Sequence, residues 1–103
     1  MDKTAIELKS TAVHYLTKGN SAKAKKLLYK VLMMDALDVF ARKKLAEIFE
    51  RDGNIEAAVD HYERLIDVYA NKGHRHFAIA IAKKIVEIYP FSAKAKSFLE
   101  EYK

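Results

Sequence analysis

Four histidines, at positions 14, 61, 74 and 76, are the side chains best suited to catalysis or metal binding in this chain of 103 residues. There is no cysteine, so a cysteine nucleophile, a cysteine-ligated zinc site, an iron–sulfur cluster and a disulfide scaffold are excluded. Three isolated glycines cannot build a phosphate-binding loop. The serines, Ser10, Ser21, Ser92 and Ser97, stand in no recognisable nucleophile setting. We therefore expect no enzyme, no catalytic residue, no metal site and no cofactor.

The densest histidine motif is His74-Arg75-His76. Two histidines can share a metal ion, but the arginine between them opposes a cation. Residues two apart also do not face each other on a helix. The motif predicts the solvent-exposed first turn of a helix. His14 and His61 each precede a tyrosine, and we expect both to be partly exposed helix residues, not ligands.

A stripe of carboxylates is formed by Glu56, Asp60, Glu63 and Asp67, which follow the spacing i, i+4, i+7 and i+11. On a helix they share one face. The stripe indicates either an acidic surface that attracts a basic partner or an ordinary solvated face. A paired-carboxylate hydrolase would need one acid desolvated so that its pKa rises, and nothing in the pattern indicates such a pocket.

Basic residues give the chain a formal net charge of +5. Residues 21–34 contain four lysines and no acid, namely Lys23, Lys25, Lys26 and Lys30. These lysines form an alternative basic patch for nucleic acid or another anionic surface. Because lysine far outnumbers arginine, and base recognition depends on arginine, a solvated lysine face is the preferred interpretation.

Six segments position these side chains: 2–18, 21–34, 37–52, 55–71, 74–88 and 92–102. Each has apolar residues at helical spacing and is rich in Ala, Leu, Lys and Glu. Gly19, Gly53 and Gly73 stand where a helix would end on a left-handed residue, and Ser92 is a candidate N-cap. The fold class is therefore all-α with about six helices. No signal peptide or membrane-spanning run is visible, so we expect a cytoplasmic protein without membrane insertion.

The chain also contains an internal repeat. The Gly19-Asn20 pair recurs as Gly53-Asn54, and Ala24 matches Ala58 in the same register. This helix–turn–helix period, about 34 residues, is typical of the tetratricopeptide repeat, and the chain resembles that family over almost its whole length. We expect a single domain over 1–103, with repeat 1 over about 2–36, repeat 2 over about 37–71, and a third unit with a capping helix over about 72–103.

The sequence departs from the family pattern in the third unit. Gly73 follows Gly53 much sooner than one full repeat period. Helix 55–71 is therefore expected to close repeat 2, through Ala58 and Tyr62, and also to open the third unit. Ala82 stands where the family has an aromatic residue. The last helix, with a polar outer face, is expected to cap the array.

The resemblance implies an antiparallel helix-hairpin solenoid and a non-enzymatic protein–protein interaction module or scaffold that binds a peptide or partner protein in its concave groove. Carried over from the family, the groove positions of repeat 1 are Ile6, Lys9, Val13 and Leu16. Those of repeat 2 are Phe40, Lys43, Glu47 and Glu50. If helix 55–71 is the next lining helix, the groove also receives Asp60, Glu63 and Asp67.

One subset of the family clamps a terminal carboxylate with Lys, Asn and Arg. Lys9 fits that clamp, but Val13 and Lys44 replace the expected asparagines and Asp60 replaces a lysine, so the resemblance implies no such clamp. Self-association through the end faces is a further possibility, because Leu37, Phe91 and Phe98 are candidates for exposed apolar residues there. The expected partner is another protein or peptide, with nucleic acid as the less favoured alternative.

Overall fold

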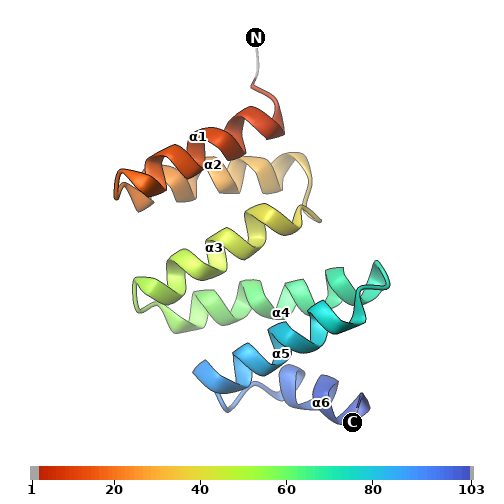
Figure 1. Ribbon diagram of the computed structural model, residues 1–103. Helices are drawn as coiled ribbons and strands as arrows, with labels where there is room; N and C mark the ends of the chain where they lie inside the picture. The colour runs from red at the N-terminus through yellow and green to blue at the C-terminus, as the bar shows by residue number, and fades with distance from the viewer. Residues whose placement is uncertain (1–2, 103) are drawn as a thin grey trace.

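The computed structural model describes residues 3–102 and contains six α-helices (Figure 1). Residues 1, 2 and 103 lie outside the described residues. They stand at the two ends of the predicted domain, and residues 2 and 103 are also the outer ends of its first and last units. The helices match the six predicted segments to within three residues at each end, and no strand occurs between residues 3 and 102. Their bounds are α1 Ala5–Thr17, α2 Ser21–Met34, α3 Val39–Arg51, α4 Ile55–Asn71, α5 Arg75–Ile88 and α6 Ala93–Glu101.

The helices alternate between two layers (Figure 1). In that view α1, α3 and α5 lie nearer the viewer and form the front layer, while α2, α4 and α6 lie behind. Each helix packs mainly on the helices before and after it in the chain, and the molecule measures 47 × 29 × 18 Å. Because consecutive helices are antiparallel, α1, α3 and α5 all run in the same direction.

Local sequence signals set the helix ends. Gly19, Gly53 and Gly73 have φ angles of 77°, 82° and 79°, as the predicted left-handed helix ends require. After the first two glycines, Asn20 and Asn54 cap α2 and α4 by accepting hydrogen bonds from backbone amides three residues later. Ser92 caps α6 in the same way through Ala95, which confirms the predicted cap.

The core has two parts. The first lies among α1, α2 and α3 and includes Leu28 and Leu45; the second lies among α3, α4, α5 and α6 and includes Leu65 and Ile85. Phe49 packs against both parts. Hydrophobic burial in one continuous stack therefore couples the helical hairpins to one another.

The repeat pattern is visible in the packing. Ala24, Ala58 and Ala78, each five residues after its glycine, are all fully buried, because a small side chain lets neighbouring helices approach closely. Ala82 is also fully buried. Helix α4 packs extensively on both α3 and α5, which supports its assignment to two units. The division into three units at residues 36/37 and 71/72 remains a prediction.

Residues 3–102 lack two features that would bear on function. No group of three or more His, Asp or Glu side chains there is arranged to hold a metal ion. No helix in this part of the chain has both the length and the apolar character that a membrane span requires.

Candidate functional site

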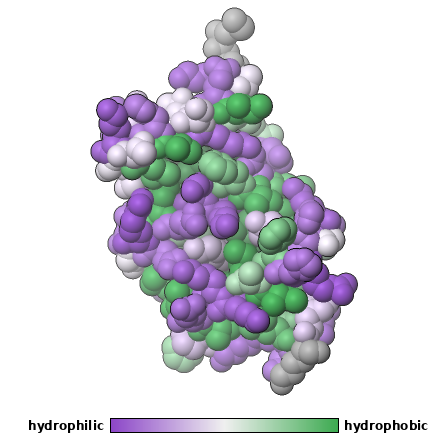
Figure 2. Space-filling view, in the orientation of Figure 1, coloured by the Kyte–Doolittle hydropathy of each residue, from purple (hydrophilic) through white to green (hydrophobic). Residues whose placement is uncertain are grey.

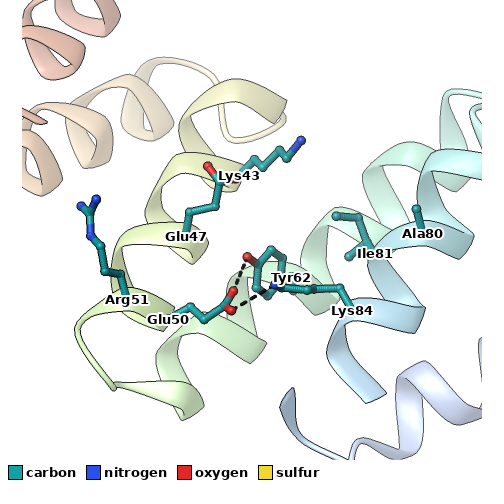
Figure 3. A pocket seen from close by; sticks show the side chains of 8 residues that line it. All are labelled: Lys43, Glu47, Glu50, Arg51, Tyr62, Ala80, Ile81 and Lys84. Carbon is teal, nitrogen blue, oxygen red and sulfur yellow. Dashed lines mark hydrogen bonds and ion pairs between the residues drawn. The ribbon is translucent and has the colours of Figure 1, made fainter. Parts of the chain in front are cut away.

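A hollow of about 430 Å³ opens on the front layer between α3 and α5 (Figure 3). Helix α5 supplies a small apolar floor, Ala80 and Ile81, and helix α4 contributes Tyr62 from below. Charged residues form the rim: Lys43, Glu47, Glu50 and Arg51 from α3, and Lys84 from α5. The hollow thus combines a patch of apolar surface with both signs of charge.

A hydrogen-bonded ion pair crosses this hollow (Figure 3). The Tyr62 hydroxyl donates to Glu50 Oε1 at 2.8 Å, and Lys84 Nζ lies 3.1 Å from Glu50 Oε2. Burial raises the pKa of Glu50, but the hydrogen bonds from Tyr62 and Lys84 outweigh burial and leave it below its ordinary value. Burial and the bond to Glu50 raise the pKa of Tyr62. Glu50 is therefore ionised and Tyr62 protonated at neutral pH, which suits charge recognition.

A second hollow, of about 250 Å³, continues along α3 and is lined by Phe40, Lys43, Lys44 and Glu47. Two ammonium groups lie near the Phe40 ring, with Lys9 Nζ at 5.9 Å and Lys44 Nζ at 5.7 Å from its centroid. Lys9 Nζ also pairs with the Asp38 carboxylate. The front face therefore carries an aromatic residue flanked by cations.

The structure places the predicted groove residues as follows. Lys43, Glu47 and Glu50 line the larger hollow, and Phe40 lines the smaller one. Ile6 and Val13 are exposed on α1. Leu16 is half-buried against the first core, and Lys9 is engaged with Asp38.

The helix that follows α3 along the front is α5, not helix 55–71. Asp60 and Glu63 line a different hollow with Glu56, Val59 and Tyr89, and Asp67 pairs with Lys94 of α6 at 2.8 Å. The conditional addition of Asp60, Glu63 and Asp67 to the groove is therefore wrong. Sequence reasoning missed Tyr62, Ala80, Ile81 and Lys84. The alternation of antiparallel helices, which assigns every second helix to one layer, was the signal that could have found the residues of α5.

The four lysines of α2, predicted as an alternative basic patch, differ in their contacts. Lys25 lies 3.8 Å from Asp52 and 4.9 Å from the centroid of Phe49, and Lys23 lies 5.2 Å from the centroid of Tyr15. Lys26 and Lys30 are exposed. Two of the four predicted lysines therefore contact aromatic rings of the neighbouring helices.

The apolar residues predicted at the end faces differ in their environments. Leu37 and Phe91 are exposed. Phe98 is half-buried against the second core and contacts the Tyr102 ring, with centroids 4.7 Å apart. Phe98 thus stabilises α6 on its own chain.

His74, Arg75 and His76 are exposed at the start of α5, as predicted, and His14 is exposed. The expectation for His61 is wrong, because only 6% of this residue is exposed. Its ring stacks on Phe49, with centroids 5.8 Å apart and planes 9° from parallel. From its position on α4, His61 faces α2 and α3. The sequence around His61 carries no signal for its contact with those two helices.

His61 belongs to a buried hydrogen-bonded network that joins α2, α3 and α4. Arg42 donates from one guanidinium nitrogen to His61 Nδ1 at 3.2 Å and from the other to the Ala36 carbonyl at 3.1 Å. Because a guanidinium only donates, Nδ1 must accept. The ring proton is therefore on Nε2, which lies 3.0 Å from the Tyr29 hydroxyl and donates to it.

We expect the free energy of unfolding to fall as the pH falls below about 6.5. Burial, together with Arg42, lowers the pKa of His61 in the folded protein. The unfolded chain then binds a proton that the folded protein does not, so acid favours unfolding by up to about 1.4 kcal/mol per pH unit for this one group. Above about pH 7.5 this contribution is constant, because His61 is neutral in both states.

Urea titrations between about pH 5 and 8 measure this effect. The His61→Gln variant should show a flatter dependence than the wild-type protein over that range. The exposed His14→Gln variant is the matched control and should follow the wild type. An unchanged pH dependence in His61→Gln would contradict the assignment of a neutral His61.

The geometry defines an all-α protein of stacked antiparallel helical hairpins with a charged, partly apolar front face. Residues 44–72 match the tetratricopeptide repeat family model, which covers most of α3, the Gly53 turn and α4. This match supports the resemblance to the tetratricopeptide repeat that the recurrence of the Gly-Asn pairs predicted. Repeats of this family generally mediate protein–protein interactions. No curated protein matches the chain.

Proposed function

We propose that this chain is a non-enzymatic module, a scaffold of the cytoplasm, that docks a peptide or a partner protein on the front layer formed by α1, α3 and α5. The observation that carries the proposal is the hollow between α3 and α5, whose rim carries two cationic side chains without an ion-pair partner among the described residues. Within residues 3–102, neither Lys43 nor Arg51 has an ion-pair or hydrogen-bond partner. Both can therefore receive an acidic ligand.

The apolar and the charged residues of the hollow would have different roles in recognition. Contact with Ala80 and Ile81 would remove apolar surface from water and supply affinity. The charges of Lys43, Arg51 and Glu47 would set orientation and accelerate association. Glu50 and Lys84 already neutralise each other across the hollow, so their pair positions α5 against α3 and leaves the other cations available.

Reversing the charge of Lys43 is expected to weaken an acidic partner about tenfold. Lys43 is exposed, so Lys43→Glu should preserve the fold. The wild-type and variant proteins would serve as baits in lysate of the source cells, with and without nuclease, and the captured partner would then be titrated against both. Lys9 is not a suitable second site, because its charge holds Asp38.

The matched control is Lys18→Glu, which makes the same change of charge at the exposed end of α1. It should bind like the wild type. Equal affinity of the Lys43→Glu and wild-type proteins for every nuclease-resistant partner would contradict the proposed front-face site.

Binding of nucleic acid or an anionic surface by α2 remains a second candidate. Lys26 and Lys30 are exposed one helical turn apart and have no partner within residues 3–102. Two results together would favour this function. Capture from the lysate would be lost after nuclease treatment, and the affinity would fall steeply as the salt concentration rises.

A further inference from the structure

The back layer separates the two signs of charge by helix. Helix α2 has four lysines and no acid, whereas α4 has four acids and a single arginine, Arg64. The front layer differs, because α3 alone carries several charges of both signs. Figure 2 shows that front face, where hydrophilic and hydrophobic side chains are interspersed. Only the back layer therefore offers a basic helix and an acidic helix as distinct surfaces.

The exposed side of α2 combines lysine with apolar side chains. Four exposed residues follow the spacing i, i+3, i+4 and i+7, namely Lys26, Tyr29, Lys30 and Met33. Residues at this spacing share one side of a helix. The exposed fractions of Tyr29 and Met33 are 41% and 86%. Neither Lys26 nor Lys30 has an ion-pair or hydrogen-bond partner within residues 3–102, so this side of α2 is available to another molecule.

The exposed side of α4 carries the complementary charge. Glu56 and Asp60 are exposed and line one hollow. Glu56 has no partner in the described part of the chain, and Asp60 pairs with Arg64 of its own helix. No ion pair between residues 3 and 102 joins α2 to α4. The basic helix and the acidic helix therefore do not neutralise each other within one chain.

A two-fold axis would bring these two surfaces together. Helices α2 and α4 run in the same direction (Figure 1), and Tyr29 of α2 reaches His61 of α4 with a hydrogen bond of 3.0 Å. An axis parallel to both helices and midway between them places α2 of one copy against α4 of the other, and the reverse. Lys26 and Asp60 are separated by the interval of the two Gly-Asn pairs, so they lie level with each other. This match holds for any distance between α2 and α4, because both copies share it.

We propose that the back layer is a homodimer interface, in which a second copy of this chain packs across α2 and α4 about this two-fold axis. Lys26 of each copy would face Asp60 of the other, so that the symmetry makes the attraction twice. Tyr29 lies between the two helices and brings apolar surface to the centre of the contact. Arg64 is level with Lys30 and opposes the attraction there, so we expect a weak dimer.

The dimer is separate from the proposed front-face function. The hollow between α3 and α5 lies on the opposite layer (Figures 1 and 3), so it would stay open in both copies. The two proposals therefore make different demands on the chain. Lys43→Glu should affect only the front-face partner, and a change at Lys26 should affect only dimerisation.

Sedimentation equilibrium of the full chain measures the dimer. At about 100 μM and low salt, the wild-type mass should rise from that of one chain, 11.8 kDa, toward twice that value. The mass should fall again as salt screens the charges. Lys26→Glu and Asp60→Lys should each weaken dimerisation at least about tenfold, because each change places like charges opposite one another.

Lys43→Glu is the matched control. It makes the same change of charge as Lys26→Glu at an exposed residue of the front layer and should dimerise like the wild type. A monomeric wild type under these conditions would overturn the proposal, and so would dimerisation of Lys26→Glu or Asp60→Lys at the wild-type concentration.

A mixture of the two variants tests the symmetry of the contact. When Lys26→Glu pairs with Asp60→Lys, the introduced glutamate faces the introduced lysine, and the native Lys26 faces the native Asp60. Both contacts then attract, so the mixture should dimerise like the wild type although neither variant does so alone. This recovery would also show that both variants are folded. A mixture that stays monomeric would contradict the pairing of Lys26 with Asp60, and a mass above that of two chains would replace the two-fold axis with a head-to-tail contact.

Discussion

Replacing Leu65 by alanine is expected to lower the free energy of unfolding by about 2–5 kcal/mol. Leu65 is fully buried in the second core, on the helix that packs on both α3 and α5. The substitution removes buried apolar surface and leaves a cavity that the rigid stack fills only partly. A small domain has a total stability of about 5–15 kcal/mol, so the loss is a large fraction. Urea unfolding followed by circular dichroism measures it.

The location of the cavity gives this prediction a second readout. Because stacked hairpins are coupled mainly through their nearest neighbours, amide hydrogen exchange in Leu65→Ala should increase more in α5 and α6 than in α1. Leu37→Ala is the matched control, since Leu37 is exposed and its truncation should change stability by no more than about 0.5 kcal/mol. Similar losses of unfolding free energy in Leu65→Ala and Leu37→Ala would contradict the assigned core.

Replacing Arg42 by alanine is expected to cost about 2–4 kcal/mol of stability. Only 9% of Arg42 is exposed, and its guanidinium satisfies His61 Nδ1 and the Ala36 carbonyl. The substitution leaves both acceptors without a donor and removes the packing of the side-chain stem. Chemical denaturation should show the loss, and the ring protons of Tyr29 and His61 should shift in the NMR spectrum because the network that joins them is broken.

Two variants separate the parts of this effect. Arg42→Met keeps most of the stem and removes the donors, so it should retain part of the lost stability. Arg64→Ala is the control, because Arg64 is exposed and pairs only with Asp60 on its own helix among the described residues, an interaction worth about 0.3–0.5 kcal/mol. If Arg42→Ala were no more destabilising than Arg64→Ala, the network would have no structural role.

Short-range features of this molecule could be predicted from the sequence. The six helices, the glycines of positive φ and the Ser92 cap all depend on interactions within about five residues, and each was found where its residues predicted it. The regular spacing of the Gly-Asn pairs likewise indicated the tetratricopeptide repeat. Lys43, Glu47 and Glu50 of the front face were implied by the resemblance to the tetratricopeptide repeat, and all three line the larger hollow.

Features that join distant segments could not be predicted in this way. The carboxylate stripe of α4 was assigned conditionally to the groove, but α4 is a helix of the back layer and α5 lines the hollow in its place. His61 was expected to be partly exposed, yet it is buried between helices α2 and α3, whose contacting residues Tyr29 and Arg42 lie 32 and 19 positions earlier. Helical periodicity identifies the apolar and the polar side of a helix. It does not identify which neighbouring helix each side contacts.

Residue types and their spacing alone determined that this protein is all-α, built on a tetratricopeptide-like repeat period, and without a recognisable catalytic motif. These properties depend on propensity, capping and periodicity, which act locally along the chain. Only the tertiary structure decided that α3 and α5 share the hollow, that Arg42 and His61 are buried together, and that Ile6, Phe40 and Phe77 are exposed. Each of these depends on how antiparallel helices alternate and pack, which is a property of the whole stack.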